Sequence, residues 1–271
     1  MKILFLGDIV GRAGRNAIVT HLPRLRQYWD LDFVVANGEN ATQSRGITPA
    51  HADLLLRHGI DCMTLGDHAF DQRQLIGAID SRPNIVRPLN LARRCAGRGF
   101  AVISNERGQK LLVIVALGQV FMRQPFDSAV NQLDELLSRY PLARSVDATV
   151  LDFHCEATSE KMMAGIWCDG RATLVAGTHT HIPTRDARIL GKGTAFVTDA
   201  GMCGDYDSVI GLDPGEPMRR FVTGMTSSRF TAAKKEASLS GVIVETQKGT
   251  GLAATIEQIM VGGAFGAKYP Y

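Results

Sequence analysis

The chain has 271 residues, of which 45% are hydrophobic and 21% charged, the balance of a globular protein with a sizeable core. Its formal net charge of +3 is too small to argue for a nucleic acid or a membrane surface as the partner. The longest apolar run, at 111–117, falls far short of the ~20 residues that cross a bilayer. Five cysteines without a CxxC pair indicate reduced thiols, so we expect a soluble, cytoplasmic protein.

The first part of the chain alternates between strand-like and helix-like segments. The hydrophobic patterns predict strands at 2–7, 32–37 and 61–66. Each strand is followed by a predicted helix, at 12–28, 49–58 and 71–79. The helix at 49–58 has a well-marked start, because Thr48 can act as its N-cap and Pro49 suits the first helical position. This alternation predicts a parallel sheet covered by helices.

The rest of the chain is richer in strands. An antiparallel pair is expected at 99–104 and 111–117, and helices at 127–139 and 158–167. Further strands are expected at 147–153, 172–177, 187–190, 194–198, 239–245 and 252–260. No stretch is long enough to act as a linker, so residues 1–271 are expected to form a single domain of two sheets with helices outside. The glycine-rich tail after about residue 260 is expected to be peripheral.

Five of the apolar runs end on side chains of the types that bind metals. These residues are Asp8, Glu39, Asn40, Asp67, His68, His154, His179 and His181. A buried strand has no use for such groups, so they collect where it leaves the core. In open α/β sheets, ligands bind beyond the carboxyl ends of the strands. Oxygen and imidazole ligands together suit hard or borderline divalent cations, so the sequence predicts one converging site with two metal ions.

Two cations close together repel each other and need a bridging anion. Glu39 is the best candidate, because it follows a central strand and has a flexible stem. The alternative is that Glu39 and Asn40 only form a helix cap or a turn. Asn37 and Gly38 can supply the turn without them, which favours the metal-binding interpretation.

The chain has seven histidines, four of them at the predicted strand ends. His179 and His181 would share one face of an extended segment, so both imidazoles could point into the same cavity. The pair alone is weak evidence and gains its weight from the other strand-end residues. The remaining three, His21, His51 and His58, fall in predicted helices and are expected to be packed or solvated.

The motifs and their order resemble those of a known family. They are GDIVGRAGR at 7–15, NGEN at 37–40, GDH at 66–68, DFHCEATSEK at 152–161, DGRA at 169–172, GTHTH at 177–181 and TDAGMCGDYD at 198–207. Over residues 1 to about 260 the chain resembles the YmdB-like family, a bacterial branch of the calcineurin-type metallophosphoesterases. The resemblance implies a four-layer α/β/β/α sandwich. It also implies two divalent or mixed-valence metal ions, iron or manganese, and hydrolysis of phosphodiesters, with 2′,3′- or 3′,5′-cyclic nucleotides as substrates.

The resemblance also assigns roles to the strand-end residues. One metal would be held by Asp8, Glu39, Asn40 and His181. The second would be held by Glu39, Asp67, His154 and His179, with Glu39 as the bridge. A metal-bridging hydroxide would attack phosphorus, and His68, free of metal, would be the proton donor to the leaving oxygen.

Two residues depart from the family pattern, Asp67 and Asp205, and Asp205 lies in GMCGDYD where the family more often has a proline. The family usually has GNH where this chain has GDH, so Asp67 replaces an asparagine. The aspartate can still coordinate through oxygen, and its added negative charge should strengthen metal binding and raise the pKa of the bridging water. It lacks the amide group that could donate a hydrogen bond to a phosphate oxygen. We therefore expect changes in rate, substrate preference and metal choice, but not in fold or site.

Two alternative functions remain open from the sequence. The same dinuclear centre serves phosphomonoesterases and phosphoprotein phosphatases. In the other alternative the metals are structural or regulatory, and the protein acts by binding RNA or a protein partner. A small-molecule phosphodiester is the expected partner, and the resemblance is compatible with self-association. Lys161 and Thr158 could contact phosphate, or could start and decorate a helix with Thr158 as its N-cap.

Overall fold

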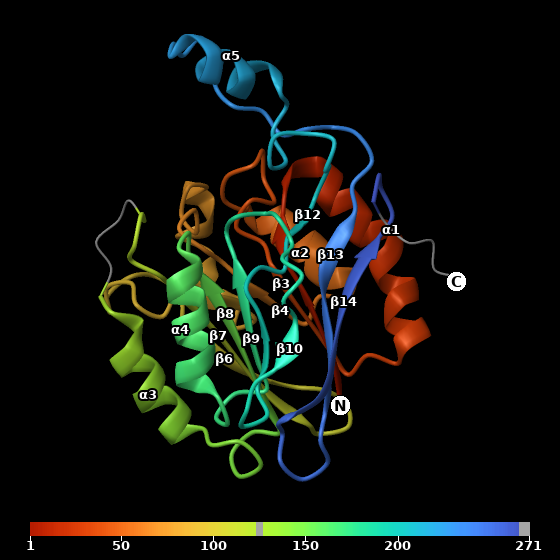
Figure 1. Cartoon of the computed structure of the whole chain (residues 1–271), viewed down its shortest axis with the longest axis vertical. Helices are drawn as coiled ribbons and strands as arrows, with labels where there is room; N and C mark the ends of the chain where they lie inside the picture. Colours follow the sequence, from red (N-terminus) through yellow and green to blue (C-terminus); the bar gives the residue numbers. More distant parts are fainter. Residues whose placement is uncertain (123–126, 266–271) are drawn as a thin grey trace.

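The computed structural model describes residues 1–122 and 127–265, and two six-stranded sheets form its centre (Figure 1). The first sheet has the order β14-β13-β1-β3-β4-β5. Its four parallel strands are β1 (Lys2–Leu6), β3 (Phe33–Asn37), β4 (Cys62–Thr64) and β5 (Ile85–Val86). The antiparallel strands β13 (Leu239–Thr246) and β14 (Ala253–Val261) extend it at one edge.

The second sheet has the order β10-β11-β9-β8-β7-β6. Its parallel strands are β7 (Lys110–Leu117), β8 (Ala148–His154), β9 (Leu174–Thr178) and β11 (Ala195–Val197). The edge strands β6 (Phe100–Ser104) and β10 (Arg188–Ile189) run antiparallel to their neighbours. The antiparallel pair predicted from 99–104 and 111–117 is confirmed. Two short strands, β2 (Asp8–Ile9) and β12 (Met202–Cys203), pair beyond the first sheet.

The strands of both sheets are apolar on both faces because each sheet lies between two cores. In β1, Ile3 and Phe5 belong to the core between the sheets, whereas Leu4 and Leu6 belong to the core under α1 (Gly11–Trp29) and α2 (Pro49–Arg57). In β7 the same alternation directs one set of side chains inward and the other towards α3 (Ala129–Arg139) and α4 (Thr158–Cys168). The layers are therefore α/β/β/α, as the resemblance implied.

Most predicted helices are found, with corrections at two places. Thr48 caps α2 as expected, because its Oγ1 accepts a hydrogen bond from His51 N over 3.3 Å. The helix predicted at 71–79 is wrong, and that segment holds the 3₁₀ turns η1 (Arg73–Leu75) and η2 (Ile79–Ser81). A glycine inside it, Gly77, disfavours a helix by about 1 kcal/mol, and few of its residues are buried to offset that cost.

Helix α5 (Gly215–Thr223) was not predicted, and it projects away from the two sheets (Figure 1). No residue of α5 is buried, and Phe221 is 94% exposed. Its local stability comes from Glu216, whose carboxylate pairs with Arg220 over 2.6 Å and accepts a hydrogen bond from Ser227 N over 2.9 Å. Met218, Phe221 and Val222 do have helical spacing, but the segment was not assigned from the sequence.

The remaining expectations concern the cysteines, the tail and the membrane. All five cysteines are free thiols, and four of them are buried. The tail predicted to be peripheral starts where β14 ends, at Val261, and its residues 266–271 lie outside the described part. Among the described helices, none combines the length and the hydropathy that a bilayer crossing requires.

Candidate metal centre

The eight side chains singled out in the sequence lie at or just beyond the carboxyl ends of strands from both sheets. Asp8, Glu39 with Asn40, and Asp67 with His68 follow β1, β3 and β4 of the first sheet. His154 ends β8, and His179 with His181 follows β9 of the second sheet. Because the two sheets face each other, their ends bring these residues to one place.

Four of these side chains form a tight cluster. Glu39, Asp67, His154 and His179 each offer one ligand atom, and these atoms all lie within 4.8 Å of one another. At its centre, His154 Nε2 lies 3.1 Å from Asp67 Oδ1, 3.3 Å from Glu39 Oε1 and 3.0 Å from His179 Nδ1. This quartet is the same as the set that the family resemblance assigns to the second metal.

The other three candidates, Asn40, His181 and Asp8, lie next to the quartet. Asn40 Nδ2 donates to Glu39 Oε1 over 2.9 Å and lies 3.2 Å from His181 Nε2. Asp8 joins the groups, because its Oδ2 accepts from His179 N over 3.1 Å and its Oδ1 lies 3.8 Å from His154 Nδ1. Glu39 Oε1 thus contacts both His154 of the quartet and Asn40 of the second group.

Two buried oxygen atoms indicate that the centre fits a cation. Asp8 Oδ1 and Asn40 Oδ1 are buried and have no hydrogen-bond partner, an arrangement that costs free energy unless another group satisfies them. Burial, opposed by His154 and reinforced by Glu39, raises the pKa of Asp8 to about 8. A cation would satisfy both oxygens and hold Asp8 as a carboxylate. Gly66 leaves room for it, because a Cβ there would collide with Glu39 Oε2 and His154 Nε2.

The charges within the quartet also compensate for one another. Burial would lower the pKa of His154, but the charge of Glu39 and hydrogen bonds with Asp67 and Glu39 raise it well above its ordinary value. Burial would raise the pKa of Asp67, but hydrogen bonds with His154 and His179 hold it far below its usual range. A positive charge is therefore stabilised at the centre of the quartet, where a metal ion would also be favoured.

A buried carboxylate fixes the ring of His154. Thr178 Oγ1 donates to Asp152 Oδ1 over 2.5 Å, so this hydroxyl accepts from His154 Nδ1 over 2.8 Å. Asp152 is fully buried and also accepts from Thr64 Oγ1 and Asn37 Nδ2. Because the proton is on Nδ1, the other ring nitrogen, Nε2, is unprotonated. It faces the quartet and is the nitrogen that can coordinate a metal.

The two histidines after β9 reach the centre in a way that the sequence did not predict. The strand ends at Thr178, and His179 and His181 have φ values of 94° and 67° in the left-handed region. The expected extended segment, with both rings on one face, is therefore wrong. Non-glycine residues in this region store strain of order 1–3 kcal/mol, which is typical of functional sites. His181 Nδ1 donates to Ile210 O over 2.7 Å, leaving Nε2 free to coordinate.

His68 lies at the edge of the centre, with a quarter of its side chain exposed. Its backbone N–H donates to Glu39 Oε2 over 3.0 Å, which fixes the turn that carries it. Its Nδ1 lies 3.0 Å from Asp71 Oδ2, and its Nε2 lies 3.9 Å from Asp67 Oδ2. Asp71 therefore orients the ring so that Nε2 faces the centre.

A profile of the family described as YmdB-like protein matches residues 4–259 of the chain. The chain belongs to the YmdB-like family. It is 40% identical over 261 residues to a 2′,3′-cyclic-nucleotide 2′-phosphodiesterase of Bacillus subtilis (strain 168), covering 96% of this chain and 97% of the relative.

Two solved structures match the fold of this chain. A protein from Thermus thermophilus is 36% identical with a TM-score of 0.89, and the match covers 97% of this chain and 100% of that one. A structure described as a novel phosphatase from Mycoplasma pneumoniae is 34% identical with a TM-score of 0.88, covering 97% and 93%.

In this YmdB-like chain, sequence reasoning missed the residues that support the candidate ligands. Asp152 could have been found, because it lies two positions before His154 and so on the same face of β8. Asp71 could not, because its segment was predicted as a helix that began there. Lys161 was considered as a phosphate contact, but it is buried and donates to Asp199 Oδ2 over 2.6 Å and to Thr178 O over 2.7 Å. The N-cap of α4 is Ala157, and Thr158 is its first helical residue.

The Lys161–Asp199 pair has a predictable effect on stability. We expect Lys161→Met to lower the free energy of unfolding by about 3–5 kcal/mol, because it leaves the buried Asp199 carboxylate without its cation. Urea unfolding followed by circular dichroism measures the change. The matched control, Lys2→Met, breaks an exposed pair with Glu245 and should cost less than about 1 kcal/mol. Equal, small changes in both variants would contradict the structural role of Lys161.

Proposed function

We propose that the chain is a dinuclear metal-dependent phosphodiesterase that hydrolyses small phosphodiesters, with 2′,3′- or 3′,5′-cyclic nucleotides as substrates. The observation that carries the proposal is the cluster of four ligand-competent side chains with two orphaned buried oxygens beside it. The B. subtilis relative, named as a 2′,3′-cyclic-nucleotide 2′-phosphodiesterase, supports the substrate class. With either class of cyclic nucleotide as the substrate, the chain is a phosphoric ester hydrolase.

The residues fit two metal ions, iron or manganese, with Glu39 between them. One would be held by Asp8, Glu39, Asn40 and His181, and the other by Glu39, Asp67, His154 and His179. When bound, two divalent cations activate water at neutral pH and neutralise charge on the phosphoryl oxygens. Asp67 adds a carboxylate to the second set and thereby favours retention of its cation.

The chain's own residues handle the leaving group. His68 Nε2 donates a proton to the departing alkoxide oxygen, a contribution of ~10²–10⁴ in rate. Asp71 Oδ2, 3.0 Å from Nδ1, holds the ring in the orientation for this transfer. In a cyclic diester the leaving oxygen stays attached to the ribose, so the product is a nucleoside monophosphate.

The proposal is tested by hydrolysis of bis-p-nitrophenyl phosphate and 2′,3′-cyclic AMP after reconstitution with Mn²⁺ or Fe²⁺. We expect turnover that a chelator removes and metal restores. Asp8→Ala should lower turnover by at least ~10²-fold, since even partners outside the ligand set typically change metal affinity or activity by 10–100-fold. The surface variant Asp30→Ala is the matched control and should leave turnover unchanged. Metal-loaded protein that hydrolyses neither substrate would refute the proposal.

A phosphomonoesterase is the second candidate, favoured by the M. pneumoniae structure described as a phosphatase. The same candidate ligands serve both reactions. Comparison of p-nitrophenyl phosphate with bis-p-nitrophenyl phosphate separates the two, because a monoesterase prefers the former in kcat/KM and the proposed diesterase prefers the latter.

A further inference from the structure

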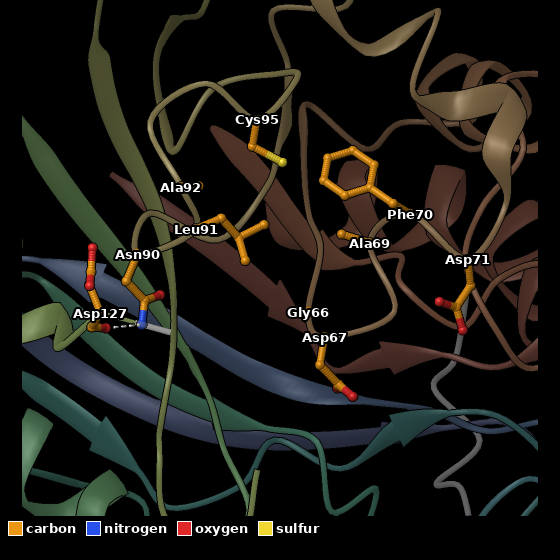
Figure 2. Close-up of a pocket in the computed structure, with 10 residues that line it drawn as sticks. All are labelled: Gly66, Asp67, Ala69, Phe70, Asp71, Asn90, Leu91, Ala92, Cys95 and Asp127. Atoms are coloured by element: carbon orange, nitrogen blue, oxygen red, sulfur yellow. Dashed lines mark hydrogen bonds between the residues drawn. The ribbon is translucent and has the colours of Figure 1, made fainter. Parts of the chain in front are cut away.

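A cavity of about 550 Å³ opens beside the candidate metal centre and shares Asp67 with it. It is lined by residues of the segments 66–71 and 90–95 and by Asp127 (Figure 2). Its volume falls in the range of 300–1,000 Å³ that is typical of small-molecule sites. A ligand whose phosphate lies at the metal centre could extend directly into this cavity.

One wall is fixed relative to the metal centre by the turn that carries Asp67 and His68. The N–H of Ala69 donates to Gly66 O over 3.2 Å, and the N–H of Asp71 donates to His68 O over 3.1 Å. Phe70 lies between these two turns and packs against the core under α1 and α2. Its ring therefore stays at a set position from Asp67.

The opposite wall is anchored to the carboxyl end of β7. Asn90 Nδ2 donates to Leu117 O over 2.9 Å and to Asp127 O over 2.8 Å, and its Oδ1 accepts from Leu117 N over 2.9 Å. These bonds use both amide protons of Asn90, so this side chain positions Leu91 and has no proton left for a ligand. Figure 2 shows Leu91 and Phe70 on opposite sides of the cavity, with Asp67 at its edge.

The described wall of the cavity offers no lysine or arginine to bind a second phosphate. Three of the ten residues that line it are aspartates, Asp67, Asp71 and Asp127, and none of these described residues is lysine or arginine. An anion placed there would be repelled. A neutral group with apolar faces and N–H donors at its edge suits the cavity, because Phe70 and Leu91 can cover the faces and the Asp127 carboxylate can accept a proton.

From this arrangement, and resting on the function proposed above, we infer that the cavity holds the nucleobase of the cyclic nucleotide between Phe70 and Leu91. The cyclic phosphate then lies at the metal centre, with Asp67 at the junction of the two. The part of the substrate that enters the cavity carries no further phosphate, so nucleoside cyclic monophosphates are the substrate class. The wall has few directed donors, so purines and pyrimidines are both accepted.

The test compares 2′,3′-cyclic AMP with methyl β-D-ribofuranoside 2′,3′-cyclic phosphate, which has the same cyclic phosphate and no base. Replacing an aromatic residue that stacks on a base by alanine typically weakens binding about tenfold or more. We expect Phe70→Ala to lower kcat/KM for cyclic AMP by about 10- to 100-fold, mainly through KM, and to leave the base-free substrate within about twofold. Phe70→Tyr should restore the wild-type values, because it keeps the ring.

Two further variants keep the test decisive. Phe221→Ala removes an exposed ring on α5 and should change neither substrate, which makes it the matched control. Leu91→Trp fills the cavity and should lower turnover of cyclic AMP while sparing the base-free diester, even where Phe70→Ala does not fold. Metal content is measured for each variant to show that the centre is intact.

The outcomes separate the inference from the function on which it rests. Wild-type protein that turns over neither substrate with metal bound overturns the proposed function, and the inference falls with it. Wild-type activity with equal losses on both substrates in Phe70→Ala and Leu91→Trp overturns the inference alone. A loss of kcat/KM that is confined to cyclic AMP supports both the proposed function and the inference.

Discussion

Replacement of His68 by alanine is expected to lower kcat for an unactivated diester such as 2′,3′-cyclic AMP by ~10²–10⁴-fold. The expected cause is the loss of the proton donor to the leaving oxygen. Metal content should stay at the wild-type value, because the His68 side chain is not a candidate ligand and its backbone N–H bond to Glu39 survives the substitution. Single-turnover kinetics with metal analysis on the same samples measures both quantities.

The choice of substrate makes this prediction specific to acid catalysis. A p-nitrophenolate leaving group needs little protonation, so His68→Ala should lose much less activity on bis-p-nitrophenyl phosphate than on the cyclic nucleotide. The matched control is His58→Ala, since His58 follows α2 and its Nδ1 contacts only Leu54 O of its own helix in the described structure. Full activity of His68→Ala on the cyclic nucleotide would show that another group supplies the proton.

The positions of the candidate ligands could be predicted from the sequence because they depend on one strong regularity. An apolar run that ends on Asp, Glu or His identifies a strand end, and parallel strands of one sheet end at the same edge. Asp8, Glu39, Asp67 and His154 follow this rule, and the layers follow from the alternation of apolar residues. The ligand roles themselves stay predictions until metal binding is measured.

The features that could not be predicted depend on contacts between distant segments or on backbone conformation. Nothing in the letters of GTHTH signals that His179 and His181 have positive φ, because that conformation is imposed by contacts such as Asp8 with His179 N. The cavity joins residues 66–71 to residues 90–95, two irregular loops without a periodic pattern. Lys161 resembled a surface cation in α4, and only its buried partner Asp199 shows otherwise.

The largest loss is expected for Glu39→Gln, because the Glu39 carboxylate contacts a member of each group of candidate ligands, His154 and Asn40. Its Oε1 lies 3.3 Å from His154 Nε2 and also accepts a hydrogen bond from Asn40 Nδ2 over 2.9 Å. Glutamine keeps the shape of the side chain but removes the charge that a bridge between two cations requires. We expect metal content to fall from about two ions per chain to one or fewer.

Turnover by Glu39→Gln should fall by more than ~10⁴-fold, exceeding the loss for His68→Ala. Acid catalysis contributes ~10²–10⁴, whereas the cations supply the activated water, whose pKa falls from 15.7 towards ~7 on binding. Metal analysis and kcat are compared with Glu245→Gln, which removes a carboxylate from the exposed pair with Lys2 and should change neither. If Glu39→Gln keeps both ions and loses less than about tenfold in kcat, the bridge lies elsewhere. The next carboxylate to substitute is then Asp8, whose buried Oδ1 has no hydrogen-bond partner.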